Sequence, residues 1–92
     1  MHEKRLVADL IQKATEVAAE HHADHLTVMT VRVGALSHVA AGSIAAQIRQ
    51  RAIGTPVENA RIDVVMGPGG SAAITDEHAT DVILQSVELG GD

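Results

Sequence analysis

The sequence predicts a single α+β domain in which two helices pack on one face of a three-stranded sheet. Its length of 92 residues leaves room for one hydrophobic core and no second domain. Its apolar residues recur at helical spacing in two segments, and three other segments are strand-like. These segments follow in the order helix, strand, helix, strand, strand, and no linker or internal repeat divides residues 1–92.

The first predicted helix runs from about Glu3 to His21 or His22. Its apolar side chains recur at steps of three and four and form one stripe, while most charged side chains fall on the opposite face. A strand is predicted over residues 26–33, which are rich in β-branched side chains and end at Gly34. Because both of its faces carry apolar groups, we expect this strand to lie in the middle of the sheet or to be covered on both sides.

A second, weaker helix is predicted between Gly42 and Gly54, with Ser43 as its cap. Its apolar face consists of Ile44, Ala45, Ile48 and Ala52. The next strand, residues 61–66, alternates in polarity. Its predicted inward side chains are Ile62, Val64 and Met66.

The remaining residues are predicted to form a connector and a closing strand. Residues 67–80 start with a Gly- and Pro-rich stretch and are expected to be an exposed loop without a helix. Residues 81–89 are apolar and β-branched and are predicted to form the third strand.

Composition excludes several classes of function. The net charge of −5 argues against nucleic acid and anionic membranes as partners. The absence of cysteine excludes thiolate nucleophiles and cysteine-ligated zinc. No signal-peptide stretch or membrane-length apolar run is found, so we expect a cytoplasmic protein. No arrangement typical of an enzyme is present, and a core without Phe, Trp or Tyr would gain stability from homo-oligomer formation.

The start of the chain is a candidate metal site. The amine of Met1, the backbone nitrogen and imidazole of His2, and the backbone nitrogen of Glu3 can surround one metal ion with four nitrogens. A planar set of four nitrogens suits Ni(II) or Cu(II) better than Zn(II), which prefers a tetrahedron. The alternative interpretation is that His2 is simply an exposed terminal residue.

Two further clusters contain metal-ligating residue types. His21 and His25 are spaced so that, on a helix, both imidazoles would share one face. The alternative is that the helix ends within this cluster, where histidines interact favourably with the helix dipole. The cluster of Asp76, Glu77 and His78 could also bind metal, but in a surface loop such residues are usually solvated.

Several segments, taken in order, resemble the HypA/HybF family of nickel metallochaperones in hydrogenase maturation. The similarity covers residues 1–66 and about 81–89. It is carried by the start Met1-His2-Glu3, the amphipathic first helix with Leu10 and Ile11, the segment from Val31 to Ser37, the segment from Gly54 to Asp63, and the closing Gln85-Ser86-Val87-Glu88-Leu89.

The resemblance implies a protein that binds Ni(II) through Met1, His2 and Glu3 and passes it to a [NiFe]-hydrogenase precursor, beside a maturation GTPase. The chain departs from the family pattern because residues 67–80 stand where members carry a zinc domain with two Cys-x-x-Cys motifs. Ala35 and Ala40 also replace acidic residues. Two hypotheses therefore remain open: a minimal nickel carrier without structural zinc, and a scaffold or assembly subunit that keeps the fold and partner surface but binds no metal.

Overall fold

The computed structural model describes residues 2–91, and the side chains from Lys4 onward. It contains three helices and three strands in the described residues. In chain order these are α1 (His2–Glu20), β1 (His25–Val33), α2 (Ala41–Arg51), β2 (Arg61–Met66), α3 (Ser71–Thr75) and β3 (Val82–Gly90). The predicted α+β class and the order of its five main elements are confirmed, and α3 is an addition to them.

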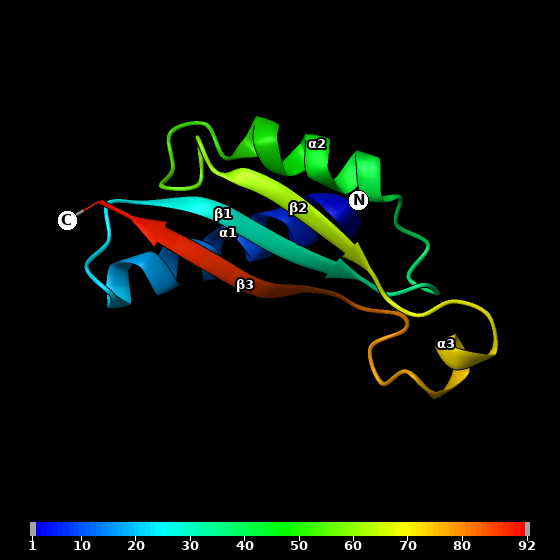
Figure 1. The fold of residues 1–92 in the computed structure, drawn as a ribbon. Helices are drawn as coiled ribbons and strands as arrows, with labels where there is room; N and C mark the ends of the chain where they lie inside the picture. The colour runs from blue at the N-terminus through cyan, green and yellow to red at the C-terminus, as the bar shows by residue number, and fades with distance from the viewer. Residues whose placement is uncertain (1, 92) are drawn as a thin grey trace.

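The strand order in the sheet is β2-β1-β3, with β1 parallel to β2 and antiparallel to β3. This order confirms that the apolar strand over residues 26–33 is central. Figure 1 shows α1 running behind β1 and β3, and α2 lying beside β2 on the same side of the sheet. Two long helices thus cover one face of the sheet, as the sequence predicts.

The hydrophobic core lies between this face and the two helices. A register shift next to Leu26 lets Leu26 and Met29, three positions apart, point to the same side of β1. The core side chains are Leu26, Met29, Val31 and Val33 of β1, Val7, Leu10, Ile11, Ala14 and Ala18 of α1, and Ile44, Ala45 and Ile48 of α2, joined by Ala52, Val57 and Ile62. The apolar faces predicted for both helices are therefore buried.

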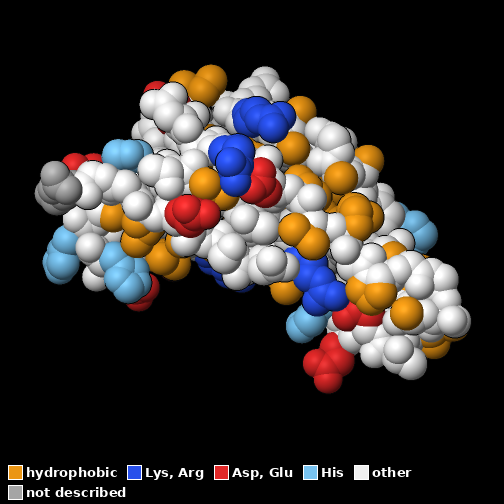
Figure 2. Space-filling model, in the orientation of Figure 1, with side chains coloured by type: hydrophobic (Ala, Val, Ile, Leu, Met, Phe, Trp, Pro, Cys, Tyr) orange, Lys and Arg blue, Asp and Glu red, His pale blue; other side chains and the backbone are white. Residues whose placement is uncertain are grey.

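The opposite face of the sheet is open, and charged side chains of both signs lie over it (Figure 2). Arg61 donates hydrogen bonds to Asp63 on the same strand, with Nη2 and Oδ2 3.0 Å apart. These hydrogen bonds and the charge of the same carboxylate raise the pKa of Arg61. Charged side chains thus lie among apolar ones on this face (Figure 2), whereas the helix-covered face is apolar.

Two local predictions are wrong. The residue before α2 is Ala40, which makes no side-chain cap hydrogen bond, and Ser43 lies inside the helix. The Ser43 hydroxyl accepts a hydrogen bond from Gln47 at 3.1 Å instead of capping the helix. Met66, predicted to point inward, is 52% exposed. It is the last residue of β2, which is an edge strand of the sheet.

The segment 67–80 also differs from the predicted loop, because it contains α3. Ala73 on α3 and Ala79 after it are buried, although most of the segment is exposed. Backbone hydrogen bonds hold its end to the turn after β1: Leu36 donates to the Ala79 carbonyl at 2.7 Å, and Gly34 donates to the Asp81 carbonyl at 2.8 Å. The short helix thus caps one end of the sheet (Figure 1).

Candidate metal centre

The candidate nitrogens at the start of the chain lie at the beginning of α1. Met1 is outside the described residues, and the side chains of His2 and Glu3 are also outside them. The backbone shows that α1 begins at His2. Amides in the first turn of a helix have no carbonyl four residues earlier to bond with. The nitrogens of His2 and Glu3 are therefore free of the helical hydrogen-bond ladder.

The positive charge at the N-terminal end of α1 restricts the net charge of a metal complex that can form there. The positive end of the helix dipole lies here, and the exposed Lys4 and Arg5 follow immediately. An added positive charge would be repelled. If the two backbone nitrogens bind Ni(II) as deprotonated amides, their charges balance that of the ion and the complex carries no net charge. A planar four-nitrogen complex is therefore compatible with this position.

The start of α1 and the loop between β1 and α2 border a common hollow. Leu6 lines a hollow of about 410 Å³ together with Ser37, Val39 and Asp81. Leu6 and Val39 are both partly buried against the core. This packing fixes the direction of the helix one turn after the candidate nitrogens. The loop residues Ala35 and Ala40 carry no side-chain ligand atom.

His21 and His25 do not share a helix, because α1 ends at Glu20 and His25 is the first residue of β1. The helix is terminated by His22, which has a φ of 55°. Its amide donates to the Ala19 carbonyl, and the Ala23 amide donates to the Ala18 carbonyl at 2.8 Å. His21 and His25 are both exposed. The structure therefore agrees with the alternative interpretation, in which the first helix ends at this histidine cluster.

Asp76 and His78 are engaged in structural contacts. The Asp76 side chain is 9% exposed and lies 3.4 Å from Nη2 of Arg32. Its other oxygen accepts a hydrogen bond from the His78 amide at 3.1 Å. The His78 ring lies 3.1 Å from the Asp81 carboxylate. The interpretation that this cluster is simply solvated is thus wrong for Asp76, which ties the end of α3 to the sheet.

Within the part of the chain whose side chains are described, no three His, Asp or Glu residues converge on one point. Sequence reasoning missed two features there. One is the Arg32–Asp76 pair, which joins positions far apart in the chain. The other is a groove between α1 and α2, whose residues are separated along the sequence and give no local signal.

Comparison with known proteins gives concordant results. Residues 1–72 match the family model described as "Hydrogenase/urease nickel incorporation, metallochaperone, hypA". A hydrogenase maturation factor HypA of Deinococcus radiodurans is 39% identical over 69 residues. That match covers 75% of this chain, and the chain spans 58% of the length of this relative.

Solved structures show the same fold. A solution structure of the Ni metallochaperone HypA from Helicobacter pylori superposes with a TM-score of 0.79 at 16% identity, covering 98% of each chain. A second solution structure, of a HypA protein, gives 0.75 at 16% identity and covers 100% of this chain and 98% of the other. The fold agrees with the family model, and the class of protein that this model describes is a nickel-incorporation metallochaperone. The chain belongs to the HypA family of hydrogenase and urease nickel incorporation.

Within the described residues, no helix is long and apolar enough to cross a membrane.

Proposed function

We propose that this chain carries Ni(II) at its N-terminus and delivers it during maturation of a [NiFe]-hydrogenase or another nickel enzyme. The proposed ligands are the Met1 amine, the backbone nitrogen and imidazole of His2, and the backbone nitrogen of Glu3. The observation that carries the proposal is that α1 begins at His2, which leaves both backbone nitrogens outside the helical hydrogen-bond ladder.

The partners that the family implies are a hydrogenase precursor and a maturation GTPase. We propose that residues 1–92 act as one nickel-binding domain and that residues 67–80, with α3, close the sheet where relatives insert a zinc domain. The absence of cysteine supports a protein that needs no structural zinc, because the stable thiolate ligands of such a site are missing.

The experiment is a calorimetric titration of Ni(II) into three proteins: the wild type, His2→Ala, and a form with a short N-terminal extension. The extension removes the free amine without changing any side chain. We expect one tight site in the wild type and loss of tight binding in both other forms. All three should give the same circular dichroism spectrum, since residue two precedes the apolar stripe of the first helix, which starts at Leu6 in the sequence.

A double variant, His21→Ala with His25→Ala, provides the matched control. It removes the alternative histidine pair and should bind Ni(II) as the wild type does. Unchanged binding by the extended form would overturn the N-terminal site. A wild type that binds no nickel would instead favour the scaffold hypothesis, in which the chain keeps only the fold and partner surface of the family.

A further inference from the structure

The two edges of the sheet differ in how they are protected against pairing with another chain. β2 and β3 are the edge strands, and each pairs with β1 alone among the described strands. β2 carries Arg61 and Asp63, and charged side chains discourage the addition of a further strand. In β3 the segment from Val82 to Val87 contains no charged residue, proline or glycine. β3, which lies along one side of the sheet in Figure 1, is therefore the less protected edge.

The pairing of β1 identifies the backbone groups of β3 that point outward. Gly67 donates to the Val33 carbonyl at 2.8 Å, so the backbone groups of Val33 face β2 and those of Arg32 face β3. Ile83 lies opposite Arg32, and its backbone groups therefore face β1. By the same alternation, the amide and carbonyl groups that point away from the sheet belong to Val82, Leu84 and Val87. Within the described part of the chain, no residue hydrogen-bonds to these outward groups.

A hollow of about 410 Å³ opens beside the start of this edge. Val82 and Ile83 of β3 line it together with Leu6 of α1 and Val39 of the loop before α2. These apolar side chains form a surface against which an apolar side chain of an added strand can pack. Proteins that bind a peptide as an added strand combine backbone hydrogen bonds with pockets for alternate side chains. The edge of β3 and the hollow together offer both.

The charges around this edge are acidic. Asp81 lies directly before β3 and borders the hollow, and Glu88 is exposed near the end of the strand. No lysine or arginine follows Arg61 in the sequence. The arginines of the two neighbouring strands are each already paired with an aspartate. The edge therefore attracts a basic segment and repels an acidic one.

We propose that the outer edge of β3 binds an extended segment of another protein, rich in lysine or arginine, as a fourth strand of the sheet. A row of outward amide and carbonyl groups is matched only by another extended backbone. The segment alternates apolar side chains, beside the half-buried Leu84 and Val87, with basic side chains, beside Glu88 on the open face. The row is interrupted at Gln85, which no residue of β1 opposes, so the segment leaves one of its own residues unpaired there.

The test is amide hydrogen exchange of the metal-free protein, followed by NMR, with and without a blocked heptapeptide in which lysine and valine alternate. In the free protein the Ile83 amide should be protected, because it bonds to β1, whereas the amides of Val82, Leu84 and Val87 should exchange fast. The peptide, at about ten times its dissociation constant, should slow exchange at these three amides about tenfold. Because no metal is present, the outcome does not depend on whether the chain binds nickel.

Two control peptides separate the causes of binding. One has glutamate in place of every lysine and should bind at least about tenfold more weakly, because the edge is acidic. The other keeps the lysines and valines but carries N-methyl groups on its backbone amides. These methyl groups remove the hydrogen-bond donors without changing charge or side chains, so this peptide should give no protection.

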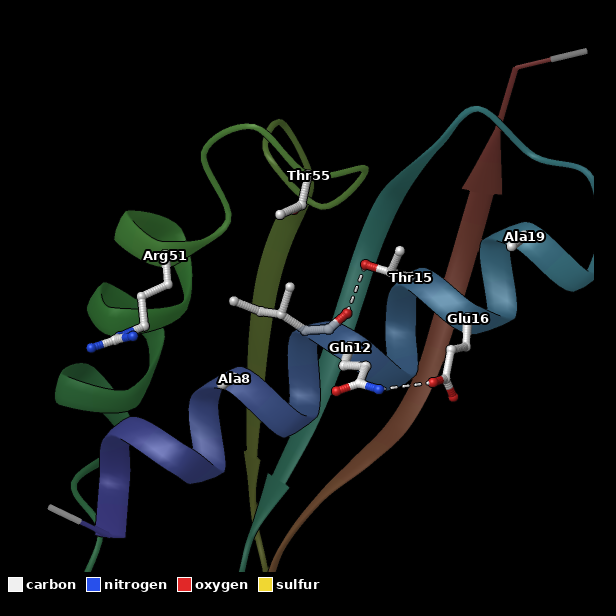
Figure 3. Close-up of a pocket in the computed structure, with 8 residues that line it drawn as sticks. Ala8, Gln12, Thr15, Glu16, Ala19, Arg51 and Thr55 are labelled. Atoms are coloured by element: carbon white, nitrogen blue, oxygen red, sulfur yellow. Dashed lines mark hydrogen bonds between the residues drawn. The ribbon is translucent and has the colours of Figure 1, made fainter.

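Two protein variants locate the charge that attracts the peptide. Glu88→Lys should weaken binding of the lysine peptide several-fold. Glu16→Lys changes the net charge by the same amount in the groove between α1 and α2, on the outer side of the helix layer, and should bind as the wild type does (Figure 3). Both variants should keep the wild-type circular dichroism spectrum, since both positions are exposed.

Four results would overturn the proposal. The first is a wild type that does not bind the lysine peptide. The second is equal binding of the lysine peptide and either control peptide. The third is a Glu88→Lys variant that binds the lysine peptide as tightly as the wild type does. The fourth is slow exchange of the three outward amides in the free protein that is lost on dilution, because a second copy of the chain then covers the edge.

Discussion

Arg32 and Asp76, 44 positions apart in the chain, meet with Nη2 and Oδ2 at 3.4 Å. Arg32 belongs to β1, and Asp76 is the residue after α3. The pair therefore connects the central strand with the segment between β2 and β3. Because the Asp76 side chain is 9% exposed, solvent screens the pair only in part.

Replacing Asp76 should loosen this segment. Asp76→Ala removes the ion pair and the acceptor for the His78 amide, and we expect the free energy of unfolding to fall by about 1 kcal/mol. Urea denaturation followed by circular dichroism measures the change. Glu77→Ala, at an exposed neighbouring position, is the control and should leave stability unchanged. Equal effects of both substitutions would show that the ion pair contributes nothing.

Two glycines should respond to alanine in opposite directions. At Gly34 an added Cβ would collide with the backbone carbonyls of His78 and Ala79, which have no room to move away. Gly34→Ala should therefore destabilise the protein by about 2 kcal/mol.

At Gly42, inside α2, an added Cβ meets no atom within 4 Å. Gly42→Ala should stabilise the protein by about 0.5–1 kcal/mol, because alanine favours the helix. Thermal unfolding of both variants tests these two expectations. A Gly34→Ala variant as stable as the wild type would contradict the close approach of the His78 and Ala79 carbonyls to Gly34.

The end of α1 should be stabilised by glycine. His22 adopts a left-handed conformation with a φ of 55°, which costs a residue with a Cβ about 1 kcal/mol. His22→Gly should recover most of this energy and raise the melting temperature. His22→Ala separates the two causes, because it removes the imidazole but keeps the Cβ, and should give no such gain. A similar gain from alanine would assign the effect to the histidine ring instead of the backbone.

Much of the fold follows from local patterns in the sequence. The stripe from Leu6 to Ala18 is buried or half-buried, and the face of α2 from Ile44 to Ala52 is buried, as their spacing predicts. The ends of elements are harder to predict, because they depend on the rest of the fold. Met66 continues the alternation of β2 and pairs with the buried Val33, but it ends an edge strand and is 52% exposed. The sequence alone cannot show this.

The same limit applies to the candidate sites. A histidine is an uncommon choice for the left-handed end of a helix, so the sequence left open whether His21 and His25 share a helix face. The role of Asp76 depends on Arg32, and the groove depends on the packing of α1 against α2. Both are contacts between distant positions, which a single sequence does not reveal. The N-terminal nitrogens can be proposed as ligands from the sequence because they are consecutive in the chain.

Removing metal should not unfold the protein. The chain contains no cysteine, and no described group of three ligating side chains could hold a structural zinc ion. Melting curves recorded with and without a strong chelator should coincide, and metal analysis of the purified protein should find no stoichiometric zinc. Bound zinc whose removal lowers the melting temperature would contradict this.

Nickel affinity should fall with acid throughout the range from about pH 9 downward. Each of the two backbone nitrogens releases a proton when it binds Ni(II) as a deprotonated amide, and protons also compete with Ni(II) for the Met1 amine and the His2 imidazole, groups whose ordinary pKa values are about 8 and about 6.5. Binding should also release protons, and calorimetry in buffers with different ionisation enthalpies counts them. We expect one planar, diamagnetic Ni(II) per chain. An affinity that stays constant from about pH 9 to about pH 7 would exclude both the amine and the deprotonated amides as ligands.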